Sequence, residues 1–126
     1  MSEVKFYRCR HCGNLVAVVE DGGPVPICCG EPMQLLVAGS VDAAAEKHVP
    51  EVTREGNVLR VTVGATEHPM LPEHHIQWIA VACERRLQLA HLEPGERPYA
   101  GFWVPEGVPV TVYEYCNLHG LWKAEA

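Results

Sequence analysis

The stretch Val108-Pro109-Val110-Thr111-Val112-Tyr113-Glu114-Tyr115-Cys116-Asn117-Leu118-His119-Gly120-Leu121-Trp122 joins a strand pattern to two possible metal ligands. Val108, Val110 and Val112 alternate with polar or aromatic residues, a period of two that is typical of a β-strand with one buried face. Cys116 and His119 follow where this strand would end. The stretch therefore predicts a strand that delivers metal ligands to one end of a β-structure.

Other parts of the chain after residue 38 show the same period. Leu59, Val61 and Val63 alternate with Arg60 and Thr62, and Ile76, Trp78 and Ala80 are expected to share one face of a strand. Turn signals at 55–57, 93–96 and 105–107 separate the runs. These intervals favour an antiparallel β-sandwich over a helix-covered parallel sheet.

Two segments are less clear from their pattern. Residues 85–92 fit a strand or a helix, and we predict a strand because the neighbouring segments are strands. Residues 41–47 could form one or two helical turns, capped by Ser40 or Asp42 and ended by Pro50. The expected fold is therefore all-β with at most a short helix.

Four histidines and one cysteine could surround a single metal ion. They are His48, His68, His74, His119 and Cys116. A single histidine is usually a surface or satisfied core residue. Here, however, His68 follows one predicted strand and His74 precedes the next. Four imidazoles and a thiolate would leave one coordination position open to a small ligand.

A second possible metal site lies in the first quarter of the chain, with the pattern Cys9-x2-Cys12-x15-Cys28-Cys29. Four thiolates suit tetrahedral zinc or iron, and an inert zinc knuckle is the simpler interpretation of the ligands alone. The adjacent Cys28 and Cys29 cannot form a C-x-x-C loop, so the angle between their sulfurs should open. High-spin iron and zinc both tolerate such a distorted tetrahedron, and the rest of the sequence favours iron.

Length and composition divide the chain of 126 residues near Gly39 and Ser40. A segment of roughly 37 residues buries too little apolar surface to fold without a metal or disulfides. We therefore expect a metal-held domain at 1–37 and a larger domain at 38–126. His11, between two of the cysteines, is expected to be exposed and not to coordinate.

Charge and hydropathy exclude several classes of function. The formal net charge is -6 and no basic face is evident, so binding to nucleic acid is not expected. No long apolar run and no secretory signal are present, which predicts a cytoplasmic protein that does not enter a membrane. In a reducing cytosol six cysteines are expected to be metal ligands or free thiols, and Cys83 has no assigned role.

Several motifs together resemble desulfoferrodoxin, the two-iron form of superoxide reductase, over nearly the whole chain. The early motifs are Tyr7-x-Cys9-x2-Cys12-Gly13-Asn14 and Cys28-Cys29-Gly30-Glu31-Pro32-Met33. The later ones are Val41-Asp42-Ala43-Ala44, Glu46-Lys47-His48-Val49-Pro50, Val61-Thr62-Val63-Gly64, Glu67-His68-Pro69-Met70, Ile76-x-Trp78-Ile79 and Tyr115-Cys116-Asn117-Leu118-His119-Gly120-Leu121-Trp122. The last motif is highly specific to that family.

The resemblance implies a desulforedoxin-like domain followed by an immunoglobulin-like antiparallel β-sandwich, in a homodimer. It implies an enzyme of superoxide detoxification that reduces superoxide to hydrogen peroxide at a non-heme ferrous centre with four histidines and Cys116 as ligands. The iron held by four cysteines would serve electron transfer or structure, and an external donor such as rubredoxin could supply electrons.

Glu46 and Lys47 directly precede the first of the four histidines, and His75 directly follows the third. The resemblance implies that Glu46 can occupy the open coordination position when iron is ferric, and Lys47 adds positive charge beside His48. His75 departs from the family, where an aromatic residue commonly follows the third histidine; spacing favours His74 as the ligand.

Two other classes of protein remain possible from the residues alone: an electron carrier and a zinc-stabilised binding module. A carrier needs no open coordination position, and a zinc module would be colourless. The five-ligand set favours the enzyme because it leaves a vacancy on the metal.

Overall fold

The computed structural model describes residues 3–41 and 45–126, without the side chains of Ala45 and Glu46. The chain forms two compact units, Glu3–Val37 and Ala38–Ala126. The all-β prediction is confirmed, since the described helical structure is one four-residue turn, α1 (Ala45–His48). The expected helix at 41–47 falls partly on residues 42–44, which lie outside the described residues.

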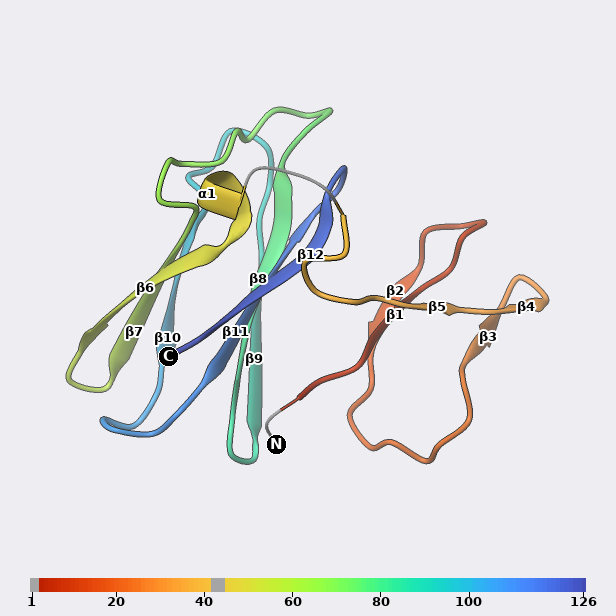
Figure 1. The fold of residues 1–126 in the computed structure, drawn as a ribbon, viewed down its shortest axis with the longest axis horizontal. Helices are drawn as coiled ribbons and strands as arrows, with labels where there is room; N and C mark the ends of the chain where they lie inside the picture. The colour runs from red at the N-terminus through yellow and green to blue at the C-terminus, as the bar shows by residue number, and fades with distance from the viewer. Residues whose placement is uncertain (1–2, 42–44) are drawn as a thin grey trace. The chain divides into compact units, whose positions relative to one another are not determined.

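The first unit is built from short strands around its cysteine turns (Figure 1). One sheet has the order β2-β1-β5, with strands β1 (Phe6–Arg8), β2 (Leu15–Ala17) and β5 (Gln34–Leu35). A separate hairpin pairs β3 (Ile27–Cys28) with β4 (Glu31–Pro32). Tyr7, Cys9 and Met33 form a small core, so one of the cysteines is itself buried.

The second unit is a sandwich of two antiparallel sheets (Figure 1). One sheet has the order β10-β7-β6, with β6 (Pro50–Glu55), β7 (Val58–Val63) and β10 (Tyr99–Trp103). The other has the order β12-β11-β8-β9, with β8 (Ile76–Cys83), β9 (Arg86–His91), β11 (Thr111–Cys116) and β12 (Gly120–Glu125). The ambiguous segment 85–92 is thus a strand, as predicted.

The core of the sandwich contains the alternating apolar residues of β7 together with residues of the facing sheet. Leu59, Val61 and Val63 are completely buried, and Val110 and Val112 lie in the same cluster. Burial of such apolar side chains is the main contribution to the stability of two packed sheets. The period-two prediction is therefore confirmed for β7 and for the run that leads into β11.

The prediction for β8 is wrong in one respect, because Ile76 does not share a face with Trp78 and Ala80. Tyr115 pairs with Trp78 while Cys116 pairs with Ile76, so Gln77 is an additional residue in β8. A β-bulge of this kind reverses the alternation beyond it. Ile76 consequently joins the core with Ile79 and Val81, whereas Trp78 stacks on Tyr115 with ring centroids 5.7 Å apart.

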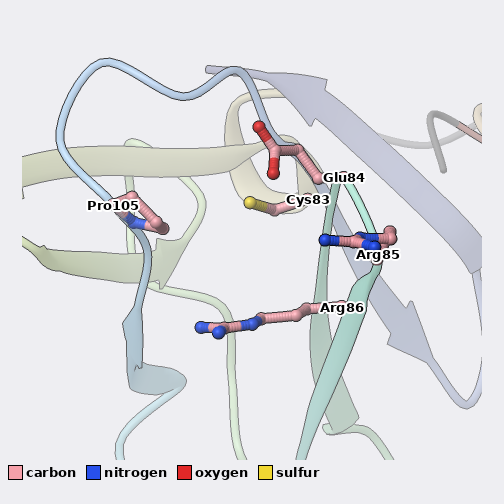
Figure 2. Close-up of a pocket in the computed structure, with 5 residues that line it drawn as sticks. All are labelled: Cys83, Glu84, Arg85, Arg86 and Pro105. Atoms are coloured by element: carbon pink, nitrogen blue, oxygen red, sulfur yellow. The ribbon is translucent and has the colours of Figure 1, made fainter.

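At the far end of β8 the turn into β9 borders a hollow of about 110 Å³ with Pro105 on its other side (Figure 2). Cys83, Glu84, Arg85 and Arg86 line it. The Arg86 guanidinium lies 4.3 Å from the centre of the Trp103 ring and makes a cation–π contact with it.

In the described part of the chain, no helix is long and apolar enough to cross a membrane.

Candidate metal centres

One end of the sandwich gathers the five predicted ligands of the second site. They come from the end of α1, the segment between β7 and β8, the end of β11 and the turn before β12. The donor atoms of His48, His68, His74, Cys116 and His119 all lie within 4.8 Å of one another. The structure therefore brings together every residue that the sequence proposed for this site, and His75 is not in the group.

The spacing of these donors suits a metal ion. His48 Nε2 lies 3.1 Å from His119 Nδ1 and 3.2 Å from His68 Nε2. Two nitrogens bound at right angles to one ion would lie about 3 Å apart, given metal–nitrogen bonds of about 2.1 Å. Cys116 Sγ is 3.5 Å from His68 Nε2 and 3.9 Å from His119 Nδ1. The group is therefore compact enough for all five to bind the same ion.

The protonation of His68 also suits a metal. Its Nδ1 lies 2.7 Å from the Pro69 carbonyl oxygen, which can only accept a hydrogen bond, so the proton resides on Nδ1. Burial, with a smaller contribution from the nearby histidines, lowers the pKa of His68 to about 4, although the bond to the Pro69 carbonyl acts in the opposite direction. At neutral pH its Nε2 therefore presents a lone pair to the centre of the group.

His74 and Cys116 provide two further observations. His74 Nε2 is buried and has no hydrogen-bond partner among the described residues, which is costly unless a cation occupies the centre of the group. Burial raises the pKa of the Cys116 thiol, while the backbone N–H groups of His119 and Leu118 act in the opposite direction. A bound cation would favour loss of the thiol proton. The donor set thus fits a metal with imidazole and thiolate ligands.

Neighbouring residues orient the ligands. The His48 ring stacks on Trp122, with ring centroids 5.1 Å apart and an interplanar angle of 26°. Trp122 Nε1 donates a hydrogen bond to the His119 carbonyl oxygen at 3.0 Å. Through these two contacts Trp122 supports the segments that carry His48 and His119. Gly120 has φ +76°, which allows the chain to turn from β11 into β12 without steric cost.

The catalytic pair predicted next to His48 is only partly described. Lys47 lies in α1 and is exposed. The side chain of Glu46 lies outside the described residues, so its predicted role stays a prediction. Both residues precede His48 in the same helical turn.

Sequence reasoning missed two residues beside this site, one on the strand that ends at Cys116 and one in the turn that follows it. Glu114 is completely buried, and neither carboxylate oxygen has a hydrogen-bond partner among the described residues. Burial raises its pKa well above the usual value. Asn117 was quoted only as part of a motif, yet its side chain bonds to the segment that carries His74. The preference of asparagine for bonding nearby backbone groups in turns was the available signal.

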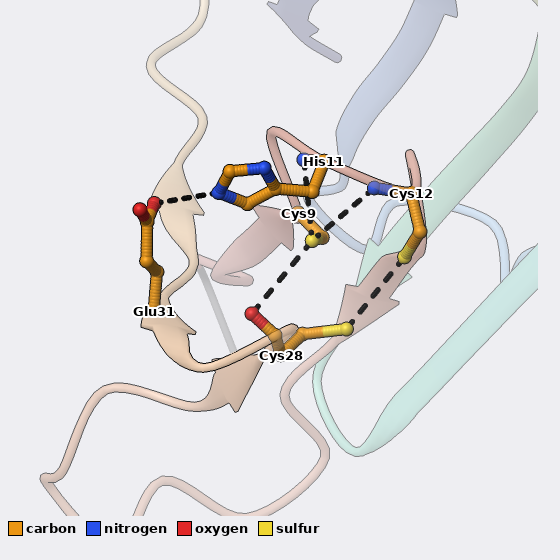
Figure 3. Close-up of polar contacts among 5 residues, drawn as sticks. All are labelled: Cys9, His11, Cys12, Cys28 and Glu31. Atoms are coloured by element: carbon orange, nitrogen blue, oxygen red, sulfur yellow. Dashed lines mark hydrogen bonds and ion pairs between the residues drawn. The ribbon is translucent and has the colours of Figure 1, made fainter.

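The four early cysteines form the second group, in which each donor atom lies within 4.8 Å of the others. Cys12 Sγ and Cys28 Sγ are 3.7 Å apart (Figure 3). Two sulfurs of a tetrahedral site with bonds of about 2.3 Å would be about 3.8 Å apart. All six cysteines of the chain are free thiols.

The turn after Cys9 directs backbone groups at sulfur. The N–H groups of His11 and Cys12 donate to Cys9 Sγ at 3.4 and 3.5 Å. These bonds lower the pKa of Cys9 to about 6, whereas contacts with Cys9 and the other thiols raise the pKa of Cys29 to about 12. Binding of a cation to all four would require every thiol to lose its proton.

Two details of this site concern its edges. His11 is exposed, as expected, and its Nε2 lies 2.9 Å from a Glu31 carboxylate oxygen (Figure 3). Cys29 has φ +52°, and the following Gly30 also has positive φ. The left-handed backbone at Cys29 is unusual for a residue with a side chain and turns two adjacent thiols toward one centre.

Sequence models of one family match both units. The desulfoferrodoxin model matches residues 40–125, and the model of the desulfoferrodoxin N-terminal domain matches residues 2–36. A desulfoferrodoxin of Nitratidesulfovibrio vulgaris is 45% identical over 125 residues, which cover 99% of this chain and 98% of the relative. A superoxide reductase of Pyrococcus horikoshii is 36% identical over 104 residues, 68% of this chain and 90% of the relative.

A solved structure agrees with these matches. The crystal structure of the superoxide reductase from Treponema pallidum superposes with a TM-score of 0.79 at 34% identity, covering 97% of this chain and 98% of that one. The sequence matches, the fold and the two donor groups lead to one assignment. The chain belongs to the desulfoferrodoxin family.

Proposed function

We propose that this protein is a superoxide reductase that converts superoxide to hydrogen peroxide and so removes superoxide from the cell. The observation that carries the proposal is the convergence of four imidazoles and one thiolate within 4.8 Å. Relatives and a solved structure that bear the name superoxide reductase support it. The reaction joins superoxide, one electron and two protons into one molecule of hydrogen peroxide.

The proposed ligands of the reactive iron are His48, His68, His74, His119 and Cys116. Iron bound there would supply the electron by passing from the ferrous to the ferric state. The chain itself provides a neutral imidazole at His68, because burial lowers its pKa to about 4, and burial also lowers the pKa of His74. It also provides a sulfur donor whose position is set by the end of β11. Five protein donors leave room for a small anion.

Lys47 and Glu46 are the proposed catalytic residues. The exposed ammonium group of Lys47 precedes His48 directly, and a positive charge there would draw superoxide toward the site. The net charge of -6 opposes this attraction only weakly, because salt screens exposed charges beyond about 8 Å. We propose that the Glu46 carboxylate closes the open position after turnover and leaves it when superoxide binds.

Cys9, Cys12, Cys28 and Cys29 are the proposed ligands of a second iron that relays electrons or holds the domain at 1–37 together. Support comes from the sulfur spacing of 3.7 Å between Cys12 and Cys28. The proposed catalytic domain is 38–126. We further propose a cytoplasmic homodimer that receives electrons from an external donor such as rubredoxin.

Rapid mixing of the anaerobic, ferrous protein with superoxide tests the activity. We expect one hydrogen peroxide for each superoxide consumed and no release of oxygen. The zinc-loaded protein is the control, because zinc has no accessible second oxidation state. Oxygen released in the same amount as peroxide would instead identify a dismutase and overturn the proposal.

A further inference from the structure

Asn117 links two ligand-bearing segments of the second site. It lies between Cys116 and His119 in sequence, and its side chain reaches the residues on both sides of His74. The His75 N–H donates to Asn117 Oδ1 at 2.9 Å, and Asn117 Nδ2 donates to the Glu73 carbonyl oxygen at 3.0 Å. The Asn117 backbone N–H also donates to the His75 carbonyl oxygen at 3.2 Å. These three bonds enclose His74 from either side.

The backbone of His74 itself is held by Leu71. The Leu71 N–H donates to the His74 carbonyl oxygen at 2.9 Å, and the His74 N–H donates to the Leu71 carbonyl oxygen at 3.1 Å. The bonds from Asn117 and Leu71 therefore leave little freedom in the backbone on either side of the imidazole. Of the two segments that Asn117 joins, one carries His74 and the other carries Cys116 and His119.

The other histidines have different supports. His48 stacks on Trp122, and His68 is oriented by a 2.7 Å bond from Nδ1 to the Pro69 carbonyl oxygen. The His74 ring, in contrast, meets the rings of two other proposed ligands, His68 and His119, with centroids 4.6 and 5.1 Å away. Its position relative to the other donors thus depends strongly on how its backbone is held.

Asparagine is needed at position 117 because the regular pairing of β8 with β11 ends just before this residue. The register shifts between Tyr115 and Cys116, after which the two strands no longer pair in the regular way. The carboxamide of Asn117 offers an acceptor oxygen and an N–H donor, as the backbone C=O and N–H groups of a strand residue would. It therefore continues the pairing one step beyond the bulge. Alanine can make neither side-chain bond, and aspartate retains only the acceptor.

We propose that Asn117 is a positioning residue that holds His74 at ligand distance from the other donors. This inference rests on the proposed function of the five donors as a metal site. Outer partners that orient ligands typically change metal affinity by about 10- to 100-fold when they are removed. Asn117 would act through backbone position and not by contact with the metal or the substrate.

The test compares Asn117→Ala with Asn57→Ala in the full-length protein with iron at both sites. Asn57 is a matched control, since its Oδ1 accepts the Glu106 N–H at 2.9 Å and its carbonyl accepts the Val104 N–H at 2.9 Å. It thus also ties two segments together by a side-chain amide, but through different residues. Iron release to an excess of chelator is followed for each site, and the paramagnetic resonance spectrum of the ferric form is recorded.

We expect Asn117→Ala to release iron from the histidine site about 10- to 100-fold faster than the wild type, with an altered resonance spectrum. Release from the four-cysteine site, which belongs to the other compact unit, should be unchanged. Denaturant unfolding of the sandwich reports separately that the variant is folded. Asn57→Ala should match the wild type in both respects. If Asn117→Ala fails to fold, Asn117→Asp, which keeps the bond from His75, takes its place in the same comparison.

Equal release rates and equal spectra for the Asn117 and Asn57 variants would overturn the inference. Failure of the proposed function would look different, because the wild type would then hold iron but not reduce superoxide. The positioning role would stand in that case if Asn117→Ala still released iron faster.

Discussion

Cys116 is completely buried at the end of β11, with its sulfur directed at the histidine group. We predict that Cys116→Ser reduces superoxide turnover by at least about 100-fold, because an alcohol is a far weaker donor than a thiolate. Cys83→Ser is the control, since Cys83 is also a buried thiol but lies outside the donor group. Rapid mixing with superoxide measures both, and normal turnover by iron-loaded Cys116→Ser would contradict the role of the sulfur.

Lys47 is the exposed cation next to the first histidine. We predict that Lys47→Ala slows the second-order reaction with superoxide by about 10-fold and weakens its dependence on salt, because a local positive charge attracts the anion. Lys5→Ala removes the same charge from the other unit, where Lys5 pairs with Asp21 at 2.7 Å. Equal rates for the two variants would show that Lys47 exerts no local attraction.

His68 makes the stability of the metal-free protein depend on pH. Burial lowers its pKa from 6.5 to about 4 in the folded chain. Between pH 6.5 and about 4, the His68 imidazole is protonated in the unfolded chain and neutral in the folded chain. The free energy of unfolding should therefore fall as pH decreases through this window. One such group contributes at most about 1.4 kcal/mol per pH unit within this window and nothing above it.

Denaturant unfolding of the metal-free protein at several pH values measures this dependence. His68→Gln should show a shallower decline in the same window. His91→Gln should not, because His91 is exposed on β9. The same slope in wild type and His68→Gln would contradict the assignment to His68.

The turn between β11 and β12 is the element that presents two of the donors. Gly120 has φ +76°, and a Cβ at this position would lie 3.3 Å from Val41 Cγ2. We predict that Gly120→Ala lowers the free energy of unfolding by about 1–2 kcal/mol from the left-handed backbone alone, with a further loss from the contact. It should also weaken metal retention at the histidine site, because the turn carries His119.

Gly107→Ala is the matched control for this turn. Gly107 has φ +81° with no atom within 4 Å of an added Cβ, so it shares the backbone strain but not the contact. Denaturant unfolding and chelator competition measure the two variants. If metal retention falls equally in both, the effect does not arise from the β11–β12 turn.

The strand patterns show how far element prediction reaches. The alternation in Leu59, Val61 and Val63 predicted β7 correctly, because one face of the strand lies against the core. The same reasoning failed for β8, whose residues are buried on both faces and whose register shifts at Gln77. Alternation carries no information on a strand buried on both sides, and a bulge depends on the partner strand.

At the scale of the whole molecule, the two donor groups belong to separate compact units. We predict that Cys28→Ser abolishes the visible absorption of the four-cysteine iron. Superoxide consumption with an artificial reductant should stay within about 2-fold of the wild type, because Cys28 contributes no donor to the histidine group. Absorption spectra and rapid mixing measure the two effects. A parallel loss of superoxide reduction would show that turnover requires the first iron.

The sequence by itself determined the family resemblance, the all-β class and the identity of all nine donor residues, because metal ligands and their neighbours recur as contiguous motifs. Only the tertiary structure decided which side chains meet and what holds them. Asn117 bonds to Glu73 and His75 across 42 to 44 residues of chain, and Glu114 is buried without a partner among the described residues. Such contacts depend on the pairing of β8 with β11 and on the bulge between them, which no local pattern in the chain encodes.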